Sequence, residues 1–142
     1  MLSIQYKKPV DLAGWTFFIF GILALLLGLI GLIRPEITLQ MLRFDIIERA
    51  ARPAGDYTIV FMLASSMASF NMGVYYIFAS LNDMKRFYGW TVPFRVLTFI
   101  VFSSAIASGF APKAFFGVAI WELIGAFSTG IAIYIDKQKR GK

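Results

Sequence analysis

Four long runs of apolar residues, separated by short polar stretches, dominate the pattern of this chain. Each run is at least as long as the about 20 residues that an α-helix needs to cross the hydrocarbon layer of a membrane. Because the connections are short, the pattern predicts an all-α fold, an integral membrane four-helix bundle with an antiparallel up-and-down arrangement, in a single domain covering residues 1–142. The predicted spanning helices are about residues 12–33, 57–81, 91–110 and 114–135.

The longest connection, residues 36–52, has an amphipathic pattern of its own. From Phe44 onward, apolar and charged residues fall on opposite faces of a helix, which predicts a short helix that lies on the membrane surface or caps the bundle. Before it, Ile37, Leu39 and Met41 alternate with polar residues, so an extended conformation competes with a helix at 36–43.

The composition supports the membrane assignment. Hydrophobic residues make up 58% of the chain and its mean hydropathy is +0.71, above what a soluble domain of this length shows. The net charge of +6 comes from basic residues at the ends of the apolar runs, where such residues set membrane topology, so no nucleic-acid partner is expected. The chain has no Cys and no His, which removes thiol chemistry and imidazole ligands. No cofactor or metal is therefore expected, and an enzyme is less favoured than a binding protein.

Lysine and arginine are shared unevenly between the two sides of the predicted bundle. Nine lie on the side of the termini and the 82–90 connection, and five lie on the other side. Because cytoplasmic loops are enriched in basic residues, this bias predicts a multi-pass protein of a bacterial or archaeal inner membrane, with both termini in the cytoplasm. The nine are Lys7, Lys8, Lys85, Arg86, Arg95, Lys137, Lys139, Arg140 and Lys142, and the five are Arg34, Arg43, Arg49, Arg52 and Lys113.

One acidic residue, Glu122, lies inside the last apolar run. A charge at the centre of a membrane helix costs about 2.5–3.5 kcal/mol on insertion scales, so such residues face protein or water and pair with another group. Small residues at helical spacing from Glu122, among them Ala119, Gly125 and Ala126, form a face suited to close helix contact. Glu122 is thus expected to point into the bundle, either as a proton or ligand site or as a hydrogen-bonded structural residue.

Hydroxyl groups at similar depth are the expected neighbours of Glu122. If the crossings start at equal depth, serines of the second and third runs are level with its carboxyl group and can hydrogen-bond it. These serines are Ser65, Ser66, Ser103 and Ser104.

Two further polar residues complete the candidate set. Asn71 is the one amide at depth in the second run, and Arg95 lies near the start of the third. The side chain of Arg95 is expected to extend toward the lipid headgroups. The alternative is an inward salt bridge. A direct pair with Glu122 would need both side chains fully extended, and a chain of Arg95, Asn71 and Glu122 would bridge the gap in depth.

The layout and several short motifs resemble a known group of proteins. The motifs are Gly31-Leu-Ile-Arg-Pro35-Glu36 followed by Leu39 and Leu42, then Tyr75, Tyr76 and Ala79, Arg95 early in the third helix, and Glu122-Leu-Ile-Gly125-Ala126 in the fourth. They resemble small, largely uncharacterised bacterial four-helix membrane proteins of the DoxX-like and related families. The resemblance covers nearly the whole chain and implies a four-helix bundle, but it implies no particular activity.

Two other four-helix groups agree less well with the sequence. Glu48-Arg49-Ala50-Ala51-Arg52 is similar to the basic loop of the trimeric membrane glutathione transferases, but the downstream Asn and Glu pattern of that group is missing. The charge bias also places this loop on the opposite side. Small multidrug transporters keep their essential carboxylate in the first helix, whereas residues 12–33 here contain none.

The sequence favours a non-enzymatic membrane protein that binds a lipid or a hydrophobic small molecule, or that serves as an accessory subunit of a membrane complex. Membrane lipids are the expected partners, and the small-residue faces are compatible with a homo-oligomer or a larger membrane complex. Two alternatives stay open. One is a small proton- or cation-coupled transporter that uses Glu122, and the other is a membrane-embedded enzyme of the glutathione-transferase-like type.

Overall fold

The structure, a computed structural model, describes residues 8–141 and contains only helices and loops in that range. Four of its helices are long and apolar enough to cross a membrane. The predicted all-helical class with four long apolar helices is therefore confirmed. The α-helices are α1 (Leu12–Ile33), α2 (Pro35–Met41), α3 (Thr58–Leu81), α4 (Lys85–Ala107) and α5 (Phe116–Arg140), with 3-10 turns at Arg49–Ala51 and Lys113–Phe115.

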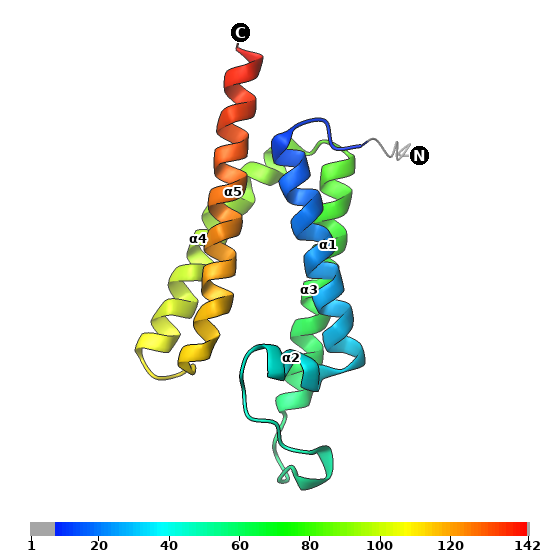
Figure 1. Cartoon of the computed structure of the whole chain (residues 1–142), viewed down its shortest axis with the longest axis vertical. Helices are drawn as coiled ribbons and strands as arrows, with labels where there is room; N and C mark the ends of the chain where they lie inside the picture. Colours follow the sequence, from blue (N-terminus) through cyan, green and yellow to red (C-terminus); the bar gives the residue numbers. More distant parts are fainter. Residues whose placement is uncertain (1–7, 142) are drawn as a thin grey trace.

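The four long helices form two pairs. α1 packs along α3 and α4 packs along α5, whereas contacts between the pairs come mainly from α1 and α5. Figure 1 shows the pairs close together at the end where α1 begins and diverging toward the other end. The connections between successive long helices alternate between the two ends. The fold is thus two joined helix pairs rather than an evenly packed bundle.

Glycines allow α1 and α3 to approach closely. A Cβ atom on Gly28 would lie 2.5 Å from the backbone nitrogen of Phe70, and a Cβ atom on Gly73 would lie 2.5 Å from the backbone nitrogen of Leu25. These distances are well inside van der Waals contact, so no larger residue fits without a shift of the backbone. Small residues that bring two backbones together are a common basis of helix association in membranes.

Aromatic side chains fill the end at which the pairs meet. The ring of Phe17 on α1 is buried, with its centroid 4.8 Å from that of Tyr76 on α3 and 4.4 Å from that of Tyr88 on α4. The hydroxyl group of Tyr88 donates a hydrogen bond to the carbonyl oxygen of Ala79 at 3.0 Å. Ala132 of α5 belongs to the same cluster. All four long helices therefore share this core.

Two aspartates cap the first turn of α1. The side chain of Asp11, the N-cap residue, accepts a hydrogen bond from the backbone N–H of Gly14 at 2.9 Å. Asp136, a buried residue of α5, accepts from the backbone N–H groups of Ala13 at 2.8 Å and Leu12 at 3.3 Å. The first N–H groups of a helix have no partner within the helix, so these contacts satisfy them. The second cap comes from the other helix pair and ties α5 to α1.

Basic residues complete this polar joint, which consists of Asp11, Lys85, Asp136 and Arg140. Lys85, at the start of α4, forms an ion pair and a hydrogen bond with Asp11, and Arg140 of α5 lies 2.9 Å from the same carboxylate. Burial by itself would raise the pKa of Asp11, but the hydrogen bonds from Lys85 and Gly14, together with the nearby positive charges, hold that pKa below its ordinary value. Asp11 is therefore held as a carboxylate at neutral pH.

The bounds of α4 differ from the prediction at its start. The helix begins at Lys85, not near residue 91, so Pro93 lies in the helix interior and not in the first turn. Proline in a helix removes one backbone hydrogen bond and is a usual cause of a bend. Figure 1 shows α4 bending in this region. The basic stretch that reads as a loop is therefore the first part of the helix.

The end of α4 also differs from the prediction. The helix stops at Ala107 because Gly109 adopts a positive φ of 79°. The N–H of Phe110 then donates to the carbonyl of Ala105 at 2.9 Å, and the N–H of Gly109 donates to that of Ile106 at 3.1 Å. This is the Schellman arrangement, which glycine favours.

Two further bounds concern α5 and the first connection. α5 continues beyond the predicted end at residue 135 to Arg140, because Asp136 and Arg140 contact the start of α1.

In the connection between α1 and α3, Pro35 starts the short helix α2, so these residues are helical and not extended. The amphipathic helix predicted from Phe44 onward is wrong, since residues 44–48 have no regular structure.

The physical reason for the missing helix is its length. A segment this short does not hold a helix without packing against the rest of the fold. A salt bridge of 2.7 Å between Arg49 and Glu36 ties the 3-10 turn to α2 instead.

Replacing Gly28 by Ala should reduce the free energy of unfolding by about 1–3 kcal/mol, because the added methyl group forces α1 and α3 apart. Unfolding in mixed detergent micelles, followed by circular dichroism, measures this change. Gly117→Ala is the matched control, since apart from its sequence neighbours and the adjoining backbone of its own helix, no described atom lies within 4 Å of its added Cβ. Equal losses of stability in the two variants would contradict the close contact of α1 and α3.

Acid should weaken the polar joint through Asp11. Because its pKa is lowered in the folded protein, the ion pairs contribute stability at neutral pH and lose it as the pH falls below about 4. Asp11→Asn keeps the helix cap but removes the charge, so it should lower the free energy of unfolding by about 0.5–1 kcal/mol at neutral pH and by almost nothing in acid. Asp45→Asn, at an exposed residue with no ion pair within residues 8–141, should change little at either pH.

Candidate functional site

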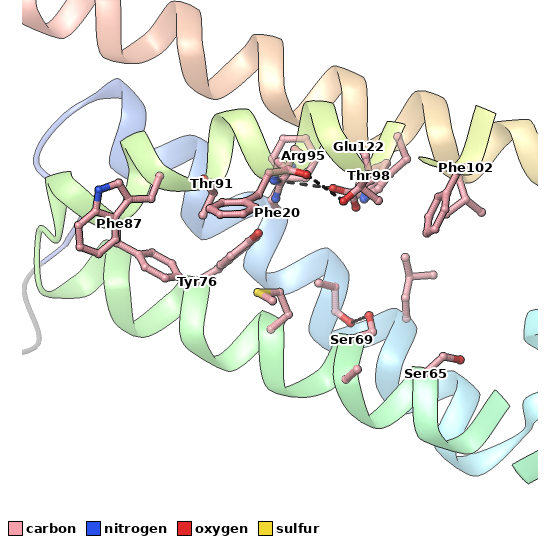
Figure 2. A pocket seen from close by; sticks show the side chains of 18 residues that line it. Phe20, Ser65, Ser69, Tyr76, Phe87, Thr91, Arg95, Thr98, Phe102 and Glu122 are labelled. Atoms are coloured by element: carbon pink, nitrogen blue, oxygen red, sulfur yellow. Dashed lines mark hydrogen bonds and ion pairs between the residues drawn. The ribbon is translucent and has the colours of Figure 1, made fainter. Parts of the chain in front are cut away.

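A cleft of about 710 Å³ lies between the two helix pairs. All four long helices line it, and its wall is mainly apolar and aromatic. Figure 2 shows two charged side chains inside it, Arg95 from α4 and Glu122 from α5. Tyr76 borders both this cleft and the aromatic core. The cleft therefore begins where the packing of the joined end stops.

Arg95 is buried in the cleft wall, with 5% of its surface exposed. Its guanidinium carbon lies 4.7 Å from the centre of the Phe20 ring and 5.0 Å from the centre of the Tyr76 ring. Its Nε atom lies 4.0 Å from Oε2 of Glu122 (Figure 2). Two aromatic rings and one carboxylate thus hold the positive charge away from solvent.

The guanidinium group occupies space that Gly125 leaves free. A Cβ atom at Gly125 would lie 1.6 Å from Nη1 of Arg95 and 2.8 Å from its Cζ. Gly125 follows Glu122 by one helical turn, so the glycine and the acid present the same face of α5 to the arginine. The inward position of Arg95 therefore depends on a glycine at residue 125.

The ion pair leaves hydrogen-bonding capacity unused. The distance of 4.0 Å between Arg95 and Glu122 is longer than the 2.7–3.2 Å of an N–H···O hydrogen bond. In the part of the chain that the structure describes, Nε and Nη1 of Arg95 are buried without a hydrogen-bond partner. The Glu122 side chain is 25% exposed. Buried donors without a partner are uncommon in proteins, and they point to a further polar group such as water or a ligand.

The prediction that Arg95 extends toward the headgroups is wrong. Its side chain points inward to Glu122, because Phe20, Tyr76 and Gly125 together form a site for it. The long α4 also contributes, since Arg95 lies well inside a helix that starts at Lys85 and not in a first turn.

The serines predicted around Glu122 are dispersed. Ser65 lines the cleft and donates a hydrogen bond to the carbonyl of Met62 at 3.0 Å. Ser66 is buried instead between α3 and α1, where it contacts Gly31. The two serines follow each other on α3, so they point in different directions and only Ser65 is placed near the site.

The other predicted neighbours do not line the cleft. Ser103 has a buried hydroxyl group without a hydrogen-bond partner among residues 8–141, and Ser104 is exposed. Asn71 lies outside the lining, and within the described chain no hydrogen bond joins it to Arg95 or Glu122. For Asn71 the reason is the divergence of the helix pairs, because residues at equal depth on α3 and α5 are not neighbours.

Sequence reasoning missed the aromatic part of the site. Phe20 and Tyr76 contact the guanidinium group, and the Trp121 ring centroid lies 4.9 Å from that of Phe20. In the sequence these residues resemble ordinary lipid-facing aromatics. The sequence signal for the site was the face of small residues around Glu122. Ala119, Gly125 and Ala126 on this face are buried in the structure.

The chemistry of the cleft is that of one fixed positive charge, one carboxyl group and an apolar wall. No cluster of metal-ligating side chains occurs within residues 8–141. The hydroxyl groups of Thr91 and Thr98 line the cleft but donate to backbone carbonyls of their own helix. Arg95 is the charged hydrogen-bond donor among the described residues of the lining.

No protein-family model, curated protein or solved structure matches this chain. The resemblance to DoxX-like proteins accordingly stays a prediction. The function has to be argued from the cleft.

Replacing Gly125 by Ala tests the position of Arg95. In the wild-type background the substitution should reduce the free energy of unfolding by about 1–3 kcal/mol, because the methyl group overlaps the guanidinium group. In an Arg95→Met background the penalty should shrink, and a double-mutant cycle measures the difference. Gly130→Ala is the control, since its Cβ would lie 3.7 Å from Val92, an ordinary contact. An identical Gly125→Ala penalty in both backgrounds would place Arg95 elsewhere.

Proposed function

We propose that this protein is a multi-pass membrane protein that binds a lipid or another hydrophobic small molecule in the cleft between its helix pairs. The observation that supports this most directly is a cleft of about 710 Å³ with an apolar wall, in which Arg95 and Glu122 are the charged side chains that residues 8–141 contribute. Small-molecule sites have volumes of about 300–1,000 Å³, mostly apolar linings and a few polar groups that orient the ligand.

The position of the cleft between helices favours a hydrophobic ligand. Four long apolar helices line it, and they carry many exposed aliphatic and aromatic side chains that suit contact with hydrocarbon. In a bilayer these helices would cross in alternating directions, and a molecule dissolved in the lipid would enter between the pairs. A water-soluble ligand would have to cross this apolar surface first.

We place the polar joint on the cytoplasmic side. Arg95 lies in the cleft, so it is left out of the count of basic residues near the ends of the helices. Eight basic residues then lie on the side of the polar joint and five on the other side. The positive-inside rule then favours cytoplasmic termini.

A cleft-filling substitution tests the binding site. Ala68 of α3 lines the cleft, so Ala68→Trp should occupy the space of the ligand. The wild-type protein, purified in mild detergent, should carry bound lipid in native mass spectrometry, and the variant should lose most of it. Ala64→Trp is the matched control because it lies one turn away on the same exposed stretch of α3, outside the lining.

Either of two results would count against the proposal. The first is wild-type protein that retains no small molecule under conditions that keep it folded. The second is equal retention in the Ala68→Trp and Ala64→Trp variants, which would place any bound lipid on the outer surface.

A further inference from the structure

Arg95 carries a charge that does not depend on its surroundings. A guanidinium group stays protonated in proteins, so the apolar cleft always contains one positive charge. Its Nε and Nη1 atoms are buried without a hydrogen-bond partner in the described part of the chain, and its side chain is 6% exposed. Arg95 belongs to the lining of the cleft, so this donor group lacks an acceptor among the described residues at a place that a bound molecule can reach.

Glu122 differs from Arg95 because its charge can be removed by a proton. Among the described residues that line the cleft, the charged or titratable groups are Tyr76 on α3, Arg95 on α4 and Glu122 on α5, and α1 contributes none. Tyr76 contacts the guanidinium group through its ring. Only Glu122 can thus adjust the net charge of the cleft in the range where carboxyl groups titrate.

We propose that the molecule bound in the cleft, on the proposed function above, is an amphiphile with an oxyanion head, and that this head binds Arg95 while Glu122 takes up a proton. The oxyanion is a carboxylate or a phosphate ester, since the planar fork of arginine matches both.

The proton keeps the cleft neutral. Before binding, Arg95 and Glu122 sum to no net charge. An added anion makes the sum negative, and two anions close together in a low-dielectric site are strongly unfavourable, so the carboxylate of Glu122 accepts a proton. One anion and one proton then enter together. The distance of 4.0 Å in the present pair shows that Glu122 is not held to Arg95 by a hydrogen bond and can give way.

The apolar wall determines that the oxyanion belongs to an amphiphile and not to a free ion. A small hydrated anion would lose its water on entry and gain contact with one arginine only. A hydrocarbon chain attached to the anion adds burial against side chains such as Leu27, Phe94 and Phe102. A cationic head is disfavoured because it would approach the fixed charge of Arg95.

Fluorescence quenching by brominated stearate measures the binding directly. Trp90 and Trp121 line the cleft, whereas Trp15 lies outside the lining and is replaced by Phe to remove its background. The methyl ester of the same acid serves as a neutral probe with an equal chain. Hexadecyl phosphate, hexadecanol, acetate and inorganic phosphate are tested as competitors, so that head and chain are separated.

The two charged residues should act in opposite directions. Arg95→Gln should weaken binding of the acid about tenfold or more and leave the ester unchanged. Glu122→Gln should strengthen binding of the acid at about pH 8, because no proton is then required. In alkaline solution, the affinity of the wild type for the acid should also fall as the pH rises, by up to about tenfold per pH unit relative to the affinity of Glu122→Gln. Titration of the probe is common to both proteins and cancels.

Matched variants separate these effects from general changes in charge. Arg86→Gln and Glu36→Gln lie outside the cleft lining and should alter neither probe. Arg95→Lys keeps the charge, so it should retain a preference for acid over ester even if Arg95→Gln does not fold. Hexadecyl phosphate should compete, whereas hexadecanol should compete less and acetate or inorganic phosphate should not.

Failure of the head-group proposal differs from failure of the proposed function. If neither acid nor ester quenches the cleft tryptophans, no hydrophobic molecule binds there and the proposed function is wrong. If both bind equally in the wild type and in Arg95→Gln, the cleft binds hydrophobic chains but the oxyanion proposal is overturned. Competition by acetate or inorganic phosphate as strong as that of hexadecyl phosphate would assign the site to a free anion and would also overturn it.

Discussion

The start of α1 is the point on which the arrangement of the helices depends. Its first N–H groups donate hydrogen bonds to the side chains of Asp11, the residue before the helix, and of Asp136 on α5. Lys85 and Arg140 form ion pairs with Asp11. These contacts, with the aromatic core beside them, join the two helix pairs at one end. Farther along, each pair is held mainly by its own contacts, so the pairs diverge and a cleft forms between them.

The cleft explains how a charged residue can lie within an apolar bundle. A guanidinium group in hydrocarbon is unfavourable, and here two aromatic faces, a carboxylate and the space left by Gly125 reduce that penalty. The site is still incomplete in its hydrogen bonds, because Arg95 keeps two buried nitrogen atoms without a partner within residues 8–141. A fully satisfied pair would indicate a structural role. This unsatisfied pair lines a cleft, which supports the proposal that a polar head binds there.

The candidate site was only partly predictable. Glu122 stands out because acids are rare within spanning helices, and the small residues at its helical spacing identify the face that is buried. Arg95 was placed wrongly because its depth depends on where α4 begins, and a basic stretch followed by Pro93 reads as a loop. The predicted serines were chosen by depth alone. For Ser65 and Ser66 on α3, that choice assumes even packing of all four helices, whereas the two helix pairs diverge. For Ser103 and Ser104 on α4, depth does not say which face of the helix a residue occupies.

The sequence by itself determined the helical class and the four long apolar helices, because these follow from local periodicity and from the length needed to cross a membrane. It also determined which face of α5 is buried. The tertiary structure alone decided that Arg95 meets Glu122, that Phe20 and Tyr76 enclose the guanidinium group, and that Asp136 caps α1. These contacts join residues far apart in the chain, and their geometry depends on the angle between helix pairs, which no local pattern encodes.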